Sequence, residues 1–307
     1  MNLFLTIFFV LFSGIGLAKP LNNIVVFGDS LSDNGNLYEY MQHRIPSSPP
    51  YFEGRFSNGP VWVEYLAESA FPGNDATHLF DYAFGGAAVV ESVDEDALFT
   101  LKREVDAYLI AHHNQADPLS LFIVWIGANN YLALSDNVEK TVHDVNKGIR
   151  KELERLEHAG ARHVLVLNLP DLGNTPAAKE FDKQTELSTY SRLHNATLAK
   201  SIESLQSLYP HVQWEAFDTD RLFRDLLSSP ETYGFTNTTG TCYDILVDKS
   251  SRRSVLTMVS NIDLKSRDER CDDYLFFDPI HSTSLAHKLL AEKVRAHLDT
   301  AGIEFAN

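Results

Sequence analysis

The sequence predicts an α/β fold, a three-layer α/β/α sandwich around a central, mostly parallel sheet of five strands. Short apolar runs bounded by turn residues alternate along the chain with longer segments of helical periodicity. This alternation is typical of a parallel sheet with helices on both faces. The runs expected to form strands are residues 24–27, 79–83, 119–126, 163–169 and 211–217.

Helical patterns fill the gaps between these runs. The segment 179–208 is apolar at Leu187, Leu198 and Leu205, close to the spacing of one helix face. Gly160 is expected to end the helix that precedes the fourth strand. No internal repeat is visible, so residues 19–307 are interpreted as a single domain. The expected helices are residues 61–70, 97–114, 138–159, 179–208 and 284–298.

Two long segments do not follow the alternation. Residues 37–58 are rich in proline and aromatic side chains, which indicates a long but ordered loop near the end of the first strand. Residues 233–274 contain both cysteines and the basic, serine-rich stretch 249–253. We expect the middle of this second segment to be exposed and open to proteases.

Composition limits the partners of the chain. With 307 residues, 44% of them hydrophobic, the chain is long enough to bury a sizeable core. The net charge of −16 argues against a nucleic-acid partner, because binding to nucleic acid depends on Lys and Arg that neutralise phosphates. The same charge favours solubility at high dilution.

The first eighteen residues are predicted to be a signal peptide. They contain no charged side chain, and residues 3–12 are almost wholly apolar. Gly16-Leu17-Ala18 offers the small residues that a signal peptidase reads, so cleavage is expected between Ala18 and Lys19. The protein is then secreted, to the periplasm or the medium. The alternative is a buried N-terminal helix or strand; the run is too short to span a membrane.

Cys242 and Cys271 are the two cysteines of the chain. In an exported protein this even, minimal count indicates one disulfide, which would close a loop over residues 242–271. Two free thiols are the alternative. A metal site is not expected, because neither cysteine has a CxxC partner or a nearby histidine pair. The adjacent His112 and His113 point in different directions on a helix and do not form a metal pair.

Four short blocks stand next to predicted strand ends or before the last helix. Ser30 lies in the first block, at the carboxyl end of a strand, where open α/β sheets bind their ligands. The blocks are Gly28-Asp29-Ser30-Leu31, Ala83-Phe84-Gly85-Gly86-Ala87-Ala88, Ile126-Gly127-Ala128-Asn129-Asn130 and Asp278-Pro279-Ile280-His281.

In this order, the four blocks make the chain resemble the GDSL (SGNH) esterase and lipase family over roughly residues 24–298. The stretch 54–62 is similar to a further signature of that family. The resemblance implies the flavodoxin-like SGNH fold, a serine esterase activity and no metal or organic cofactor. Within the family, the chain is similar to secreted bacterial lysophospholipases A and to glycerophospholipid:cholesterol acyltransferases.

Ser30, His281 and Asp278 are the candidate catalytic residues. An ester-cleaving serine needs a base, and the base needs an orienting carboxylate. Asp278 and His281 lie three apart, which brings both side chains to one face of a helical turn. Alone, such a pair is commonly a helix cap and a surface histidine. Ser32 competes with Ser30 as the nucleophile, but the strand-end position and the family pattern favour Ser30.

The resemblance also implies an oxyanion hole formed by the backbone N–H groups of Ser30 and Gly86 and the side-chain amide of Asn129. A tight turn is the alternative explanation for the glycine, and a loop-capping amide is the alternative for the asparagine. The family often has aspartate where this chain has Asn130. We interpret that position as structural support.

The predicted function is a secreted serine esterase that releases fatty acid from lysophospholipids or phospholipids at a membrane or micelle surface. A sterol is a further candidate, as the acyl acceptor. We expect the aromatic loop 37–56 to form a wall for the acyl chain, or else to pack in the core. The loop 242–271 is predicted to be a lid or regulatory element, opened by an activating protease near Arg252-Arg253. A carbohydrate acetyl-esterase and a non-catalytic binding protein on the same fold remain alternatives.

Overall fold

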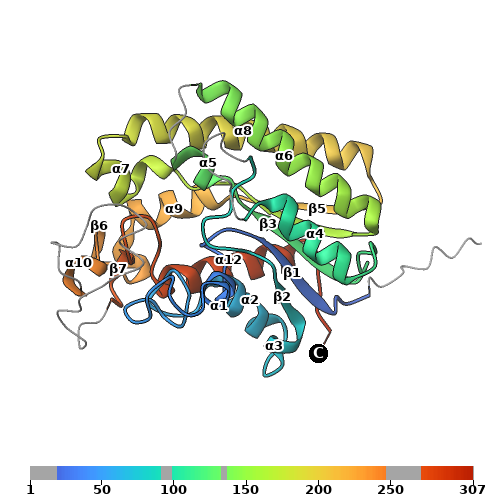
Figure 1. The fold of residues 1–307 in the computed structure, drawn as a ribbon, viewed down its shortest axis with the longest axis horizontal. Helices are drawn as coiled ribbons and strands as arrows, with labels where there is room; N and C mark the ends of the chain where they lie inside the picture. Colours follow the sequence, from blue (N-terminus) through green and yellow to red (C-terminus); the bar gives the residue numbers. More distant parts are fainter. Residues whose placement is uncertain (1–18, 91–98, 133–136, 247–270, 307) are drawn as a thin grey trace, which may run out of the picture.

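The computed structural model (Figure 1) describes residues 19–90, 99–132, 137–246 and 271–306. Its central sheet has five parallel strands in the order β2-β1-β3-β4-β5. The α/β/α fold class and all five predicted strands are therefore confirmed. The strands are β1 (Asn23–Gly28), β2 (Leu79–Asp81), β3 (Ser120–Trp125), β4 (His163–Leu167) and β5 (Gln213–Phe217).

The middle of the sheet is covered on both faces, which explains why β1, β3 and β4 consist of nearly continuous apolar runs. One group of helices covers one side of the sheet, and a second group covers the other (Figure 1). Gly160 ends one of these helices with a φ of 120°, as expected. The first group is α4 (Leu101–Ala111), α6 (Val138–Ala159) and α8 (Gln184–Leu208); the second is α2 (Trp62–Ala70) and α12 (Ser284–Thr300).

The helix expected over residues 179–208 is confirmed over 184–208 but begins later than predicted, because a separate short helix precedes it. The first, α7 (Pro176–Glu180), begins with Thr175, whose Oγ1 accepts a hydrogen bond from the Ala178 N–H. Asp182 then adopts a φ of 55°, in the left-handed region that a continuing helix does not allow. The second helix, α8, starts only after this residue.

Several shorter elements were not predicted from the sequence. Among them, β6 (Asn237–Thr241) and β7 (Tyr274–Phe276) pair in parallel as a separate two-stranded sheet. The others are α1 (Asn36–Tyr40), α3 (Asp75–His78), α5 (Ala128–Leu132), η1 (Leu172–Asn174), α9 (Thr219–Ser228), η2 (Pro230–Tyr233) and α10 (Tyr243–Leu246).

The two cysteines are joined in a disulfide, so the predicted pairing of Cys242 with Cys271 is confirmed. Cys242 directly follows β6, and Cys271 lies three residues before β7. Both pack in a small hydrophobic cluster with Tyr51, Phe56 and Phe277, apart from the main core around the sheet. This cluster explains the expected order of the loop 37–58, because it buries two of the loop's aromatic side chains, Tyr51 and Phe56.

Some predictions fall outside the described residues. The predicted signal peptide, residues 1–18, is one; the basic stretch around Arg252-Arg253, inside the disulfide loop, is another. Among the helices of the described part of the chain, none is long and apolar enough to cross a membrane.

Candidate active site

Ser30 lies two residues beyond the end of β1, in a turn that packs closely against β3 and α4. Gly28 ends the strand, and a Cβ at this position would lie 2.7 Å from the Trp125 carbonyl oxygen of β3. The Gly28 N–H donates to Glu104 Oε2 of α4 at 2.9 Å. The glycine of the first block is thus required by close packing of the strand end, and the turn presents Ser30 at the carboxyl edge of the sheet.

The structure brings Ser30, His281 and Asp278 into one hydrogen-bonded chain. Ser30 Oγ lies 2.8 Å from His281 Nε2, and His281 Nδ1 lies 2.6 Å from Asp278 Oδ2. All three side chains are buried. Asp278 Oδ1 accepts hydrogen bonds from the backbone N–H groups of Ile280 and His281, so the three-residue spacing folds as a tight turn around the carboxylate.

Tyr51 completes this arrangement, although no sequence signal pointed to it. Its hydroxyl donates to Asp278 Oδ2 at 2.7 Å, and its ring is buried in the small cluster beside the disulfide. Burial alone would raise the pKa of Asp278, but the charge of His281 and the hydrogen bonds from His281 and Tyr51 outweigh it and lower the pKa. The aspartate is therefore held as a carboxylate beside the imidazole.

Ser32, the competing serine, points elsewhere. It is fully buried, and its Oγ accepts a hydrogen bond from Trp62 Nε1 at 3.1 Å. The neighbouring Asp33 accepts hydrogen bonds from the backbone N–H groups of Gly35, Asn36, Leu37 and Gly85. These polar residues after Ser30 hold the loop and tie the first block to the second.

The stretch 54–62 fixes the start of α12 relative to α2. Ser57 Oγ donates to the Ser282 carbonyl at 3.0 Å, and Asn58 Oδ1 accepts from the Ser284 N–H at 2.8 Å. These contacts span more than two hundred residues of sequence and lie directly after His281. The family signature in this stretch therefore positions the histidine block.

Two of the expected oxyanion donors are free to act as such. Among the described residues, neither the Ser30 N–H nor the Gly86 N–H has a hydrogen-bond acceptor. Gly86 has a φ of 79°, and a Cβ at this position would meet nothing within 4 Å. Gly85, by contrast, packs against the Phe56 ring with no room for a side chain. Gly86 thus combines a left-handed backbone with an open approach, as a substrate-binding N–H requires.

The first turn of α5 ties the second block to the third. Asn129 Nδ2 donates to the Ala87 carbonyl at 2.8 Å, which leaves its second amide hydrogen for another acceptor. Asn130 accepts from the Val89 N–H and donates to the Val90 carbonyl, both at 2.8 Å. Asn130 therefore holds the loop around Val89 and Val90 in place. An aspartate there could accept from Val89 but could not donate to Val90.

Buried carboxyl groups lie around the turn. Burial raises the pKa of Asp29 to about 6, although a hydrogen bond from the Leu31 N–H opposes the shift. Burial likewise raises the pKa of Glu104 well above its usual range. Within the part of the chain that the structure describes, no group of three or more His, Cys, Asp or Glu side chains is placed to hold a metal ion.

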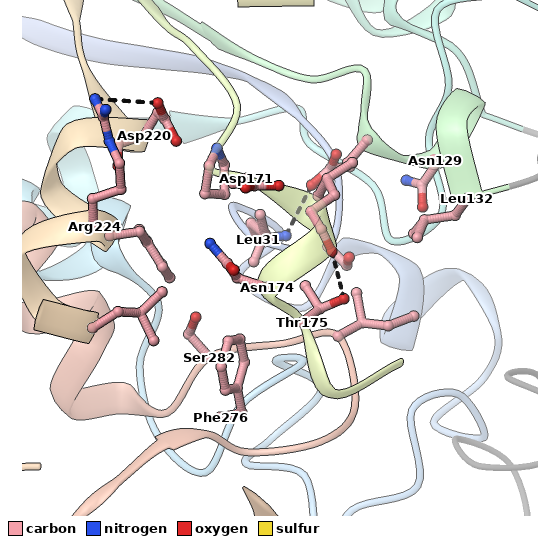
Figure 2. Close-up of a pocket in the computed structure, with 18 residues that line it drawn as sticks. Leu31, Asn129, Leu132, Asp171, Asn174, Thr175, Asp220, Arg224, Phe276 and Ser282 are labelled. Atoms are coloured by element: carbon pink, nitrogen blue, oxygen red, sulfur yellow. Dashed lines mark hydrogen bonds and ion pairs between the residues drawn. The ribbon is translucent and has the colours of Figure 1, made fainter. Parts of the chain in front are cut away.

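A pocket opens beside Ser30 (Figure 2). It is partly open to solvent, and its lining includes Ser30 and Asn129. The remaining walls come from the segment after β4, from α9 and from the residues around His281. No residue of the loop 37–56 lines it. The loop therefore forms no wall of this pocket; Tyr51 and Phe56 instead pack in the small cluster, as in the alternative expectation of core packing.

A parallel α/β/α sheet with a serine, histidine and aspartate in contact at its carboxyl edge is the arrangement of serine ester hydrolases and acyltransferases. The sequence pattern of GDSL-like lipases/acylhydrolases matches residues 24–294. The chain belongs to this family.

Relatives of the chain include an acyltransferase, a hemolysin and a secreted effector protein. The chain is 30% identical to the phosphatidylcholine-sterol acyltransferase of Aeromonas hydrophila, over 91% of this chain and 90% of that protein. It is 31% identical to the thermolabile hemolysin of Vibrio parahaemolyticus, over 89% of this chain but only 63% of the hemolysin. The secreted effector protein SseJ of Salmonella typhimurium is 28% identical, with coverages of 90% and 67%.

Proposed function

We propose that the protein is a serine-dependent lipid acylhydrolase that releases fatty acid from lysophospholipids, in which Ser30 is the nucleophile, His281 the general base and Asp278 the orienting carboxylate. The observation that carries this proposal is the pair of contacts from Ser30 Oγ to His281 Nε2 and from His281 Nδ1 to Asp278 Oδ2. Family membership supports the carboxylic ester chemistry.

In the first half-reaction, His281 Nε2 accepts the hydroxyl proton as Ser30 Oγ forms a bond to the ester carbonyl carbon. The carbonyl oxygen becomes an oxyanion, and the N–H groups of Ser30 and Gly86 and the Asn129 amide stabilise it. The intermediate collapses with cleavage of the ester C–O bond, and His281 gives its proton to the departing alcohol. Ser30 then carries the acyl group.

In the second half-reaction, an acceptor hydroxyl attacks the acyl-enzyme while His281 takes its proton. The bond between the acyl carbon and Ser30 Oγ then breaks, and His281 returns the proton to Ser30 Oγ. With water the product is a fatty acid, and with a sterol alcohol it is a sterol ester. The likeness to a protein named phosphatidylcholine-sterol acyltransferase supports acyl transfer as a second candidate activity, with phospholipase A cleavage of diacyl lipids supplying the acyl group.

The proposal extends to where the protein is located and to the surface on which it meets its substrate. We propose that residues 1–18 direct secretion, that residues 19–307 form one hydrolase domain, and that the substrate is met at a membrane or micelle surface. The disulfide supports an oxidising compartment. An activating protease that acts within the loop 242–271 remains a prediction.

A side-by-side assay tests the function against its alternatives. The purified protein and Ser30→Ala are given lysophosphatidylcholine, diacyl phosphatidylcholine with and without cholesterol, and an acetylated sugar, and are labelled with a fluorophosphonate probe. We expect release of fatty acid from lysophosphatidylcholine and labelling of Ser30, both lost in Ser30→Ala. Preference for the acetylated sugar would favour a carbohydrate esterase, and absence of labelling and turnover would favour a binding protein.

A further inference from the structure

We propose that the pocket beside Ser30 holds the acyl chain of the substrate, and that helix α9 limits the length of that chain. This inference rests on the proposed function, because it requires an acyl group on Ser30 Oγ. It goes beyond that function in assigning the pocket to the acyl side of the ester and in naming the residues that select chain length.

The position of the pocket relative to the candidate nucleophile is the first step. Ser30 and Asn129 both belong to its lining. During attack, the carbonyl carbon must lie against Ser30 Oγ with its oxygen toward the Asn129 amide. A group that enters the pocket therefore belongs to one of the two sides of the ester, the acyl chain or the alcohol.

The lining chemistry favours a hydrocarbon chain. Apolar atoms make up most of the surface that the pocket exposes, and the side chains that contribute them include Leu31, Leu132, Leu172, Phe223 and Leu227. An alkyl chain needs only such apolar surface, whereas a sugar ring needs several free hydrogen-bonding groups that converge on it.

Two polar side chains in the lining, Asp171 and Thr175, are engaged within the protein. Among the described residues, the side chains of Asn174 and Ser282 have no hydrogen-bond partner. Asp171 Oδ1 accepts hydrogen bonds from the Gly173 N–H and from Ser188 Oγ. Thr175 Oγ1 donates to the Leu172 carbonyl at 2.7 Å and also serves as the N-cap of α7. The pocket therefore presents few free partners for a carbohydrate, and we assign it to the acyl chain.

The far side of the pocket is bounded by an ion pair on α9. Figure 2 shows Asp220 and Arg224 paired there, opposite Asn129. Arg224 lies 3.3 Å from an Asp220 carboxylate oxygen, and its side chain is 61% exposed. A chain that reached this pair would strip water from the two charges, which is unfavourable. The apolar stretch between Ser30 and the pair therefore sets the chain length that fits.

Phe223 and Leu227 are the residues that define this stretch. Both lie on α9, one turn apart, line the pocket, and pack as partly buried side chains against the main core. A larger side chain at position 227 would shorten the space for the chain, and a smaller one at position 223 would extend it.

Two ester series test the assignment. The first has a constant p-nitrophenol and acyl groups from acetyl to decanoyl; the second has a constant acetyl group and alcohols of the same lengths. Leu227→Trp and Phe223→Ala are compared with the wild type and with Leu208→Trp. Leu208 is 58% exposed at the end of α8 and does not line the pocket, so it provides a matched control.

For Leu227→Trp we expect kcat/KM on the acetyl ester within about threefold of the wild type and a loss of roughly tenfold or more on octanoyl and decanoyl esters. Phe223→Ala should shift the preference toward longer acyl groups, and Leu208→Trp should match the wild type. If Leu227→Trp loses acetyl hydrolysis as well, the profile of Phe223→Ala decides the question.

Unchanged acyl profiles in both pocket variants would overturn the assignment. So would a change confined to the alcohol series, which would place the alcohol of the ester in the pocket. Failure of the proposed function itself looks different: the wild type would hydrolyse none of these esters faster than Ser30→Ala does.

Discussion

At the residue scale, the environment of Asp278 explains how the His281 imidazole is held in one orientation beside Ser30. One carboxylate oxygen is occupied by two backbone N–H groups of its own turn, and the other faces the imidazole and the Tyr51 hydroxyl. The carboxylate therefore has little freedom to rotate. A fixed carboxylate selects the tautomer in which His281 Nδ1 carries the proton and Nε2 faces Ser30.

Tyr51→Phe is predicted to weaken this arrangement without emptying the cluster. The variant keeps the ring but loses a hydrogen bond to a charged group, an interaction that contributes about 1.5–3 kcal/mol. We expect kcat/KM to fall roughly tenfold or more, on the scale of about 1.4 kcal/mol per factor of ten. Tyr108→Phe is the control, since Tyr108 is a buried tyrosine whose hydroxyl accepts from the Asp117 N–H outside the site.

Tyr51→Phe should also change the pH at which the protein unfolds in acid. Because the pKa of Asp278 is lower in the folded protein than in the unfolded chain, its ionised form stabilises the fold at pH above the unfolded value. That stabilisation is lost as the pH falls through the lowered pKa. Without the Tyr51 hydrogen bond the pKa rises, so Tyr51→Phe should unfold at a higher pH than Tyr108→Phe. Identical acid midpoints and identical kcat/KM would contradict this role.

At the element scale, α5 acts on the loop that carries Gly86. Its first turn presents two successive amides, and both hold the loop after β2, Asn129 at Ala87 and Asn130 at Val89 and Val90. Only Asn129 also lines the pocket beside Ser30. The two residues thus share a structural task, and only one of them is placed to meet an oxyanion.

Comparison of Asn129→Ala with Asn130→Ala separates these tasks. Asn130→Ala removes two hydrogen bonds from the loop, so it should lower the free energy of unfolding by about 1–3 kcal/mol. Its loss of kcat should be smaller than that of Asn129→Ala. Asn129→Ala removes one such bond and the proposed oxyanion donor, so kcat should fall roughly 100- to 1,000-fold. Urea unfolding and steady-state kinetics measure the two effects. Equal losses of kcat would assign Asn129 to loop support alone.

The sequence predicts elements well where the signal is local. Apolar runs locate the five strands, because this signal depends on neighbours within a few residues. The candidate roles of Ser30, Gly86, Asn129 and His281 come from the order of the four blocks and the family resemblance it carries. The break at Asp182 was missed because residues 179–186 contain a single apolar side chain, so no periodicity marks where the long helix begins.

Contacts between distant segments leave no comparable trace in the sequence. Tyr51 and Asp278 are 227 positions apart, and nothing in the composition of the loop 37–58 distinguishes Tyr51 from its other aromatic residues. The pocket wall on α9 was missed for a related reason. The segment 219–228 has an amphipathic pattern, but only the folded chain shows that Phe223 and Leu227 line the pocket beside Ser30.

At the scale of the whole molecule, the structure has two apolar cores with different tasks. The main core surrounds the central sheet and holds the strand ends that carry the first three blocks. The small cluster holds the fourth block: it contains Tyr51 and Phe277, and the Phe56 ring lies 5.0 Å from the His281 ring. The Cys242–Cys271 disulfide belongs to this second core. The disulfide therefore supports the side of the site that carries the base.

Removal of the disulfide should consequently affect both stability and activity. The two cysteines are 29 positions apart, a loop whose closure stabilises the fold by about 3.5 kcal/mol through the entropy of the unfolded chain. For Cys242→Ala/Cys271→Ala we expect a loss of this size in urea unfolding. We also expect a severalfold drop in kcat/KM at a temperature where the variant remains folded, because Tyr51 loses part of its packing.

Combination of the disulfide variant with Tyr51→Phe tests whether the two act through the same contact. If the disulfide supports catalysis by holding the Tyr51 hydroxyl against Asp278, its removal should matter less once that hydroxyl is gone. The loss of kcat/KM in the triple variant would then be smaller than the product of the separate losses, as expected for coupled neighbours. A loss equal to the full product would show that the disulfide reaches the site by another route, through Phe277 or the backbone of the histidine block.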